Sequence, residues 1–138
     1  MATAISPRKR EAILLVEDQP SNVLVTSAVL DMMGYACDVA VSGDEALKKF
    51  MGKNYALIIM DVQLPGIDGL ETTRWIRQIE NERNLKPTPI VAMTSNATMD
   101  DRLFCLRAGM NDYMSKPFDS KQLSLKIQEL TGQASAAA

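Results

Sequence analysis

The fold is decided by residues 55–61, Tyr-Ala-Leu-Ile-Ile-Met-Asp, in which an unbroken apolar run leads into an aspartate. An apolar run of this length is typical of a strand buried on both faces, like the central strand of a parallel sheet. It is too short to cross a membrane, which takes about 20 apolar residues. Asp61 is therefore expected at the carboxyl end of a central strand.

Shorter apolar runs and helical patterns alternate on both sides of this strand. We expect further strands at residues 12–16, 37–41, 89–93 and 112–115, and helices at residues 20–33, 42–51, 68–79, 98–108 and from 119 onward. This alternation predicts an α/β fold: a single doubly wound (βα)5 flavodoxin-like domain whose parallel sheet has the strand order 2-1-3-4-5. The domain is predicted to span residues 11–132, between a flexible segment at 1–10 and an Ala-rich tail at 133–138.

Local patterns predict further details within these elements. The inward face of the first helix is expected to carry Val25, Ala28, Val29 and Met32. The shared face of the third helix is expected to carry Thr72, Trp75, Ile76 and Ile79. Ser42 and Glu45 have the spacing of a capping box. Residues 80–89 are polar and contain proline, which predicts a loop.

The composition excludes several classes of function. The chain of 138 residues contains no histidine, so it has neither a Ser-His-Asp triad nor a histidine metal site. Its 15 basic and 17 acidic residues give a net charge of −2, which argues against nucleic-acid binding. Two cysteines are too few for a disulfide scaffold. With no long apolar segment, we expect a cytoplasmic chain that makes no contact with a membrane.

Polar residues follow four of the five expected strands. They are Glu17-Asp18, Asp61, Thr94-Ser95 and Lys116-Pro117. In an open α/β sheet, ligands bind outside the carboxyl ends of the strands. Each group alone has an ordinary explanation as a helix cap or a turn, but their coincidence at successive strand ends favours one shared site.

Three carboxylates brought together repel one another, and a hard cation relieves that repulsion. Mg²⁺ prefers oxygen ligands, here Glu17, Asp18 and Asp61, with a backbone carbonyl just past Asp61, that of Gln63, as a further candidate. A carboxylate such as Asp61 can act as a nucleophile and form an aspartyl phosphate. Lys116 and Thr94 are candidates for stabilising the phosphoryl oxygens.

Several motifs, in a fixed order, resemble one known family. They are Leu15-Val-Glu-Asp18, Met60-Asp-Val-Gln-Leu-Pro65 with Gly66-Ile-Asp-Gly69, Ala92-Met-Thr94, and Gly109-Met-Asn-Asp-Tyr113-Met-Ser-Lys116-Pro-Phe118. The chain resembles a response-regulator receiver domain of two-component phosphorelays, and it is most similar to the receivers of hybrid histidine kinases. The resemblance covers residues 11–132.

The resemblance implies a role for each matching position. Asp61 would be the phosphoacceptor, and Glu17 and Asp18, with the Gln63 carbonyl, would hold Mg²⁺ beside it. Lys116 would contact the phosphoryl group, and its bond to Pro117 would be cis. Thr94 and Tyr113 would be the switch residues, and Gln63 and Asn96 would tune hydrolysis.

The resemblance also implies partners and an output. A histidine kinase or a histidine phosphotransfer protein would donate the phosphoryl group, docking near the first helix, where Val23, Leu24 and Val25 cannot all be buried. The receiver would catalyse its own phosphorylation and a slow autodephosphorylation. Phosphorylation would switch the surface formed by the fourth helix, the fifth strand and the fifth helix.

Two other functions remain open at this point. The chain can be a non-catalytic interaction module that keeps the fold, or a hydrolase with an aspartyl nucleophile. A hydrolase needs a second acid close to the nucleophile, and Gln63 stands two residues after Asp61. This composition therefore favours the phosphoacceptor over the hydrolase.

Overall fold

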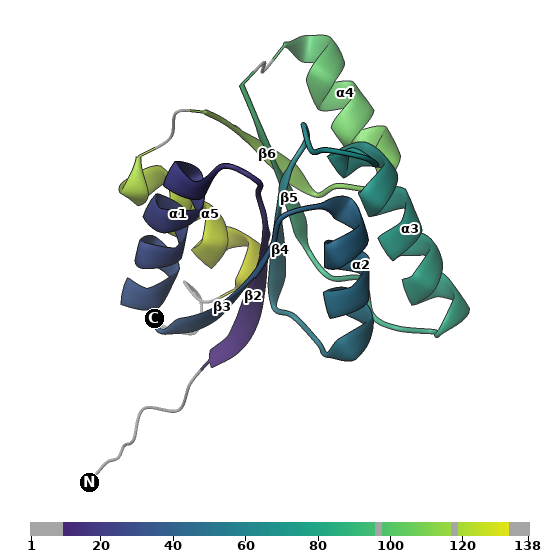
Figure 1. The fold of residues 1–138 in the computed structure, drawn as a ribbon, viewed down its shortest axis with the longest axis horizontal. Helices are drawn as coiled ribbons and strands as arrows, with labels where there is room; N and C mark the ends of the chain where they lie inside the picture. The colour runs from purple at the N-terminus through teal and green to yellow at the C-terminus, as the bar shows by residue number, and fades with distance from the viewer. Residues whose placement is uncertain (1–9, 96–97, 117–118, 133–138) are drawn as a thin grey trace, which may run out of the picture.

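Five parallel strands alternate with five helices along the described chain (Figure 1). The computed structural model describes residues 10–95, 98–116 and 119–132. The strands are β2 (Arg10–Val16), β3 (Tyr35–Ala40), β4 (Leu57–Asp61), β5 (Ile90–Thr94) and β6 (Asp112–Ser115). The helices are α1 (Pro20–Met32), α2 (Gly43–Gly52), α3 (Gly69–Glu82), α4 (Met99–Ala108) and α5 (Ser120–Thr131). None of these helices has the length and hydropathy that crossing a bilayer requires.

The sheet has the order β3-β2-β4-β5-β6, which confirms the predicted order 2-1-3-4-5. Pairing is parallel throughout, with Val16 opposite Met60, Asp61 opposite Met93, and Thr94 opposite Ser115. The carboxyl ends of β2, β4, β5 and β6 therefore meet at one edge of the sheet. That edge is where the sequence predicts the site.

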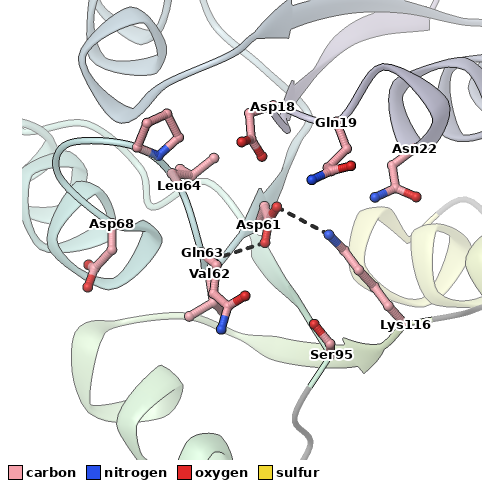
Figure 2. A pocket seen from close by; sticks show the side chains of 11 residues that line it. Asp18, Gln19, Asn22, Asp61, Val62, Gln63, Leu64, Asp68, Ser95 and Lys116 are labelled. Atoms are coloured by element: carbon pink, nitrogen blue, oxygen red, sulfur yellow. Dashed lines mark hydrogen bonds and ion pairs between the residues drawn. The ribbon is translucent and has the colours of Figure 1, made fainter.

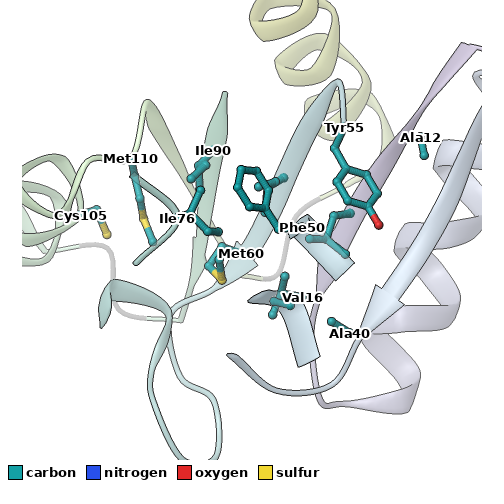
Figure 3. Close-up of a cluster of buried hydrophobic side chains, with 14 residues drawn as sticks. Ala12, Val16, Ala40, Phe50, Tyr55, Met60, Ile76, Ile90, Cys105 and Met110 are labelled. Atoms are coloured by element: carbon teal, nitrogen blue, oxygen red, sulfur yellow. The ribbon is translucent and has the colours of Figure 1, made fainter. Parts of the chain in front are cut away.

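Alternate residues of each strand point to opposite faces of the sheet, and each face has its own apolar core. The core on the side of α1 and α5 combines residues of the sheet and of the helices, among them Ile13, Leu15, Ile59, Val91, Leu123 and Ile127. The core on the side of α2, α3 and α4 does the same, and includes Leu14, Val16, Phe50, Met60, Ile76 and Cys105 (Figure 3). Because β4 and β5 are covered on both faces, every one of their residues is buried, as the unbroken apolar run predicts.

The predicted face of α1 is wrong at three of its four positions. The helix buries Thr26, Val29 and Leu30. Val25 is 54% exposed, Met32 is 86% exposed, and Ala28 is exposed as well. Apolar residues surround most of the circumference of α1, so apolar spacing alone does not select the face that meets the sheet.

Helix α3 extends to Glu82, into the stretch predicted to be a loop. Near its C-terminal end, Arg77 and Glu80 form a hydrogen-bonded cluster with the neighbouring loops, which we call the joint. The buried Glu80 accepts hydrogen bonds from Arg77 Nη1 and from the Thr88 backbone N–H, both at 2.7 Å. Arg77 also donates to the Gly109 carbonyl at 2.9 Å. The joint thereby fastens α3 to the loop before β5 and to the turn between α4 and β6.

Two further predictions need correction. Trp75 was placed on the buried face of α3, but its side chain is 46% exposed. At the start of α2, the Ser42 hydroxyl accepts from the Glu45 backbone N–H, as a capping box requires. The Glu45 carboxylate instead accepts from the Val41 N–H at 2.7 Å, one residue before the expected partner.

Both cysteines are enclosed. Cys105 is buried on α4, and Cys37 is half-buried on β3. Burial, with a smaller contribution from the Asp38 charge, raises the pKa of the Cys37 thiol to about 11. Burial, assisted by Asp101, also raises the pKa of Cys105. Neither thiol is therefore a reactive thiolate at neutral pH.

Candidate functional site

Three carboxylates lie together where β2 and β4 end. Two of them, Asp18 and Asp61, are drawn in Figure 2. Glu17 and Asp18 directly follow β2, and Asp61 is the last residue of β4. Glu17 is 2% exposed and Asp61 is 4% exposed, whereas Asp18 is exposed. Because β2 and β4 are neighbours in register, the topology itself brings these side chains together.

Lys116 directly follows β6, the strand at one end of the sheet order, and adds a positive charge to this cluster. Its Nζ lies 3.0 Å from Glu17 Oε1 and 3.1 Å from Asp61 Oδ2. Its backbone N–H donates to the Thr94 carbonyl at 2.8 Å, which ties the start of the following loop to β5. One ammonium group is thus shared between two buried carboxylates.

Backbone N–H groups orient both buried carboxylates. The Gln63 N–H donates to Asp61 Oδ1, and the Gln19 N–H donates to Glu17 Oε2, each at 3.0 Å. Gly69 holds the turn after Asp61 close to the strand, since a Cβ on Gly69 would clash with the Asp61 carbonyl oxygen. The sequence analysis quoted Gly69 only as part of a motif and missed this packing role.

The pKa of Asp61 reflects its burial and, second to that, the excess of negative charge at the site. Burial, and then the charge of Glu17, raise the pKa of Asp61 to about 6, although the Gln63 N–H and Lys116 pull it down. Burial alone would lower the pKa of Lys116. The hydrogen bond to Glu17 and the charge of Asp61 outweigh burial and raise it. Lys116 therefore stays protonated at neutral pH.

The donor set fits a hard divalent cation. Carboxylate oxygens of Glu17, Asp18 and Asp61 lie within 4.8 Å of one another. Mg²⁺ is bound in proteins through one or two carboxylates together with water and phosphate oxygens. Two of the three carboxylates are buried, and within the described ranges they share one ammonium, so a cation would relieve the remaining repulsion. The Gln63 carbonyl as a further ligand stays a prediction.

A cleft of about 750 Å³ opens over this cluster. Asp18, Asp61, Gln63 and Lys116 line it, as the predicted site requires. Thr94 is 6% exposed and does not line the cleft, whereas its neighbour Ser95 does. The strand-end rule therefore finds the correct edge but does not tell which of two adjacent hydroxyls faces the opening.

Other predicted site residues lie away from the cleft or outside the described chain. Tyr113 is half-buried on β6, and the guanidinium of Arg102 lies 4.4 Å from the centre of its ring. Asn96 and Pro117 lie outside the described residues. The predictions that concern them, hydrolysis tuning by Asn96 and a cis bond before Pro117, therefore stay predictions.

The sequence analysis missed several polar residues that line the cleft. Gln19 and Asn22 reach it from the start of α1, and Asp68 reaches it from the turn before α3. Asp68 caps α3 by accepting from the Glu71 N–H at 2.8 Å. The sequence holds no signal for Asn22, because the buried Thr26, one helical turn later on the same face of α1, is identified only by the structure.

A parallel sheet in this order, with an acidic cleft and a lysine at its carboxyl edge, defines a class of small doubly wound α/β domains whose site lies at the strand ends. The chain belongs to the response regulator receiver domain family, whose model matches residues 13–128. It is a receiver domain of two-component systems. This confirms the resemblance that the sequence motifs indicate.

Known relatives match most of this chain. It is 38% identical over 122 residues to the sensor histidine kinase GacS of Pseudomonas protegens, a match that covers 88% of this chain and 13% of the relative. The chain therefore spans only a small part of that kinase's length.

Solved structures of receivers are similar as well. The receiver domain of the sensor histidine kinase PA1611 from Pseudomonas aeruginosa, with a magnesium ion coordinated in its active-site cleft, is 43% identical with a TM-score of 0.79. The match covers 88% of this chain and 98% of that chain. A chain of the co-crystal structure of the Saccharomyces cerevisiae histidine phosphotransfer signalling protein Ypd1 and the receiver domain of Ssk1 is 30% identical, with a TM-score of 0.85. That match covers 91% of this chain and 92% of that chain.

Proposed function

We propose that this receiver takes a phosphoryl group onto Asp61 from the phosphohistidine of a histidine kinase or a histidine phosphotransfer protein. The observation that carries the proposal is the position of Asp61, which is buried at the base of the cleft and shares the Lys116 ammonium with Glu17. The Ypd1–Ssk1 complex supports this class of partner, because it joins a receiver to a histidine phosphotransfer protein.

In the proposed step, a carboxylate oxygen of Asp61 attacks phosphorus. The bond between phosphorus and the donor nitrogen breaks, and the imidazole leaves with the electron pair and takes up a proton. The product is an acyl phosphate on Asp61. Lys116 keeps its positive charge throughout and stabilises the charge that spreads over the phosphoryl oxygens.

Mg²⁺ is part of the proposal. Glu17, Asp18 and Asp61, with the Gln63 carbonyl, would hold the ion, which when bound neutralises charge on the carboxylates and the phosphoryl oxygens. The magnesium ion in the PA1611 receiver supports this assignment. Without the ion, Lys116 is the one cation among the described residues that is paired with this cluster.

Phosphorylation would also act as a switch. The new group adds roughly −1.5 to −2 charge beside Lys116 and near the end of β5. We assign Thr94, which ends β5, and Tyr113, which lies on β6 beneath Arg102, as the residues that respond. The surface formed by α4, β6 and α5 would then present a different state to a downstream protein.

The donor is proposed to dock on α1 beside the cleft. Leu24 is 72% exposed and Val25 is 54% exposed, although both are apolar. They follow Gln19 and Asn22, which line the cleft, within the first two turns of α1. The proposal includes residues 11–132 as the receiver unit and a cytoplasmic location for the phosphorelay.

Intact-mass measurement tests the phosphoacceptor directly. The chain is incubated with Mg²⁺ and acetyl phosphate beside two variants, Asp61→Asn and Asp68→Asn. We expect one added phosphoryl group on the parent chain and on Asp68→Asn, which keeps a residue able to cap α3. Neither Asp61→Asn nor a magnesium-free parent should gain mass.

An unmodified parent chain that still binds Mg²⁺ would contradict the proposal for small donors. The same measurement would then be repeated with a phosphorylated histidine phosphotransfer protein as donor. Failure with both donors would leave a non-catalytic interaction module that keeps the receiver fold.

A further inference from the structure

The first turn of α1 carries an asparagine whose position local structure does not explain. Asn22 is the third residue of the helix, whereas the N-cap is Gln19. Asparagine favours helix caps and is a poor helix former at interior positions. The Asn22 side chain makes no hydrogen bond with any other residue that the structure describes.

The helical phase places Asn22 on the buried face of α1. Residues four apart lie on the same face of a helix, and Thr26 and Leu30, four and eight residues later, are 1% and 0% exposed. Asn22 continues this face beyond the sheet, where the cleft replaces the core beneath it. It is half-buried there, so its carboxamide faces the cleft rather than bulk solvent.

Figure 2 shows the carboxamide of Asn22 extending from α1 into the cleft, on the side of the Lys116 ammonium. Gln63, the predicted hydrolysis-tuning residue within the described chain, lies on the loop after β4. The two side chains therefore approach the acceptor from different walls. Gln19 reaches the cleft too, but its side chain is exposed and less constrained.

We propose that Asn22 binds the water molecule that hydrolyses the phosphoryl group on Asp61, an inference that rests on the proposed function. The Asn22 carbonyl oxygen accepts a hydrogen bond from this water and directs the water oxygen toward phosphorus. The oxygen attacks, the bond between phosphorus and the Asp61 oxygen breaks, and Asp61 leaves as a carboxylate. The water protons pass to the released phosphate and to solvent, because a carboxamide is no base at neutral pH.

The rate of phosphoryl loss tests this role. The chain is phosphorylated with acetyl phosphate and Mg²⁺, the donor is removed by desalting, and the loss of the added mass is followed at constant Mg²⁺. Asn22→Ala and Asn22→Leu should each lengthen the half-life by about 3- to 10-fold, the effect of one lost hydrogen bond. The leucine variant fills the space of the asparagine, so it separates a lost hydrogen bond from easier entry of water.

Ser21→Ala is the matched control. Ser21 is exposed on the same helical turn and does not line the cleft. The half-life of the phosphoryl group on Ser21→Ala should therefore stay within twofold of that on the parent. The Mg²⁺ affinity of both Asn22 variants, measured from the stabilisation that Mg²⁺ adds to urea unfolding, should equal that of the parent.

The outcomes separate this inference from the proposed function. A half-life of Asn22→Leu within twofold of the parent, or shorter, would overturn the inference while Asp61 remains the acceptor. A changed Mg²⁺ affinity would also overturn it, because the substitution would then act on the carboxylates rather than on water. A parent chain that takes up no phosphoryl group from any donor would overturn the proposed function first.

Discussion

Asp61 and Glu80 are both buried carboxylates, with 4% and 3% exposure, but their surroundings are opposite. Glu80 has a guanidinium of its own from Arg77 and a backbone N–H from Thr88. Asp61 shares the single ammonium of Lys116 with Glu17 and lies near a third carboxylate, Asp18. The charges of Glu80 and Arg77 therefore balance, whereas the charges around Asp61 leave an excess of negative charge.

The joint around Glu80 is also closed in its hydrogen bonds. Arg77 Nη2 donates to Asn111 Oδ1 at 2.9 Å, and the same oxygen accepts from the Ile90 N–H at 2.9 Å. A satisfied polar network of this kind stabilises a fold. Burial alone therefore does not distinguish a functional carboxylate from a structural one. The distinguishing feature here is that the negative charges around Asp61 outnumber the positive charges paired with them.

The largest expected effect comes from breaking the balanced joint. Arg77→Ala should lower the free energy of unfolding by about 2–4 kcal/mol, because it leaves a buried carboxylate without its cation. Urea unfolding measures this change. Arg74→Ala, an exposed arginine on the same helix, should change stability by less than about 0.5 kcal/mol. Equal effects of the two substitutions would show that the joint carries no special stability.

A substitution at Asp61 should change the free energy of unfolding in the opposite direction. Asp61→Asn should raise the free energy of unfolding of the magnesium-free protein at pH 7 by roughly 1–3 kcal/mol, because it removes the cost of burying a charged carboxylate and, second to that, the repulsion from Glu17. The asparagine carbonyl can still accept from the Gln63 N–H, and Lys116 keeps Glu17. Urea unfolding in a chelating buffer measures the gain. A loss of stability would mean that the Lys116 ion pair outweighs burial and repulsion.

The same pair of proteins has a pH dependence with a definite sign. The folded-state pKa of Asp61, about 6, lies above its ordinary value of 3.8, so the folded state binds more protons between these two pH values. The parent chain therefore gains stability from this group as pH falls through that window. The advantage of Asp61→Asn should be largest near pH 7 and should shrink toward pH 4. An advantage that stays constant over this range would contradict the raised pKa.

The smallest effect is expected at Asp38, a carboxylate that is paired near the surface. Lys53 Nζ lies 2.8 Å from Asp38 Oδ2, and the Tyr55 hydroxyl donates to the same oxygen at 2.8 Å. The hydrogen bond from Lys53, aided by Tyr55 and only partly offset by burial, lowers the pKa of Asp38. Lys53→Ala should lower the free energy of unfolding by less than about 1 kcal/mol, because half of the lysine side chain is exposed.

This third carboxylate also provides a contrast in pH dependence. Because the folded-state pKa of Asp38 is depressed, its contribution is lost only as pH falls below the ordinary carboxyl range. The effect of Lys53→Ala, measured by urea unfolding, should therefore stay constant between pH 7 and about pH 5. A decline over the range where Asp61→Asn also changes would mean that Asp38 is not selectively stabilised in its charged form.

The sequence predicts the fold and the charged residues of the site because both follow from local patterns. The apolar run at residues 55–60 marks a strand covered on both faces, and register then brings Glu17, Asp61 and Lys116 to one edge. Each of these residues is adjacent to a strand end that its own neighbours identify. No long-range information is needed to find them.

The features that the sequence leaves open depend on contacts between distant segments. The face of α1 is chosen by the shape of the sheet, since Val25 and Val29 are equally apolar but only Val29 is buried. The sequence predicts that Glu80 lies in a loop, and the structure shows that Arg77 and Thr88 donate hydrogen bonds to it. Asn22 belongs to the cleft only because the buried face of α1 extends past the core.

The enclosed cysteines make this receiver suitable for optical study. Thiolates are the species that attack thiol-reactive dyes, and the pKa of Cys37 is about 11 while Cys105 is buried. A cysteine introduced at Phe104, whose side chain is 51% exposed on α4, would therefore take up a dye far faster than either native thiol. A single fluorophore on that helix could then follow the arrival and departure of the phosphoryl group in real time, without removal of any native residue elsewhere in the chain.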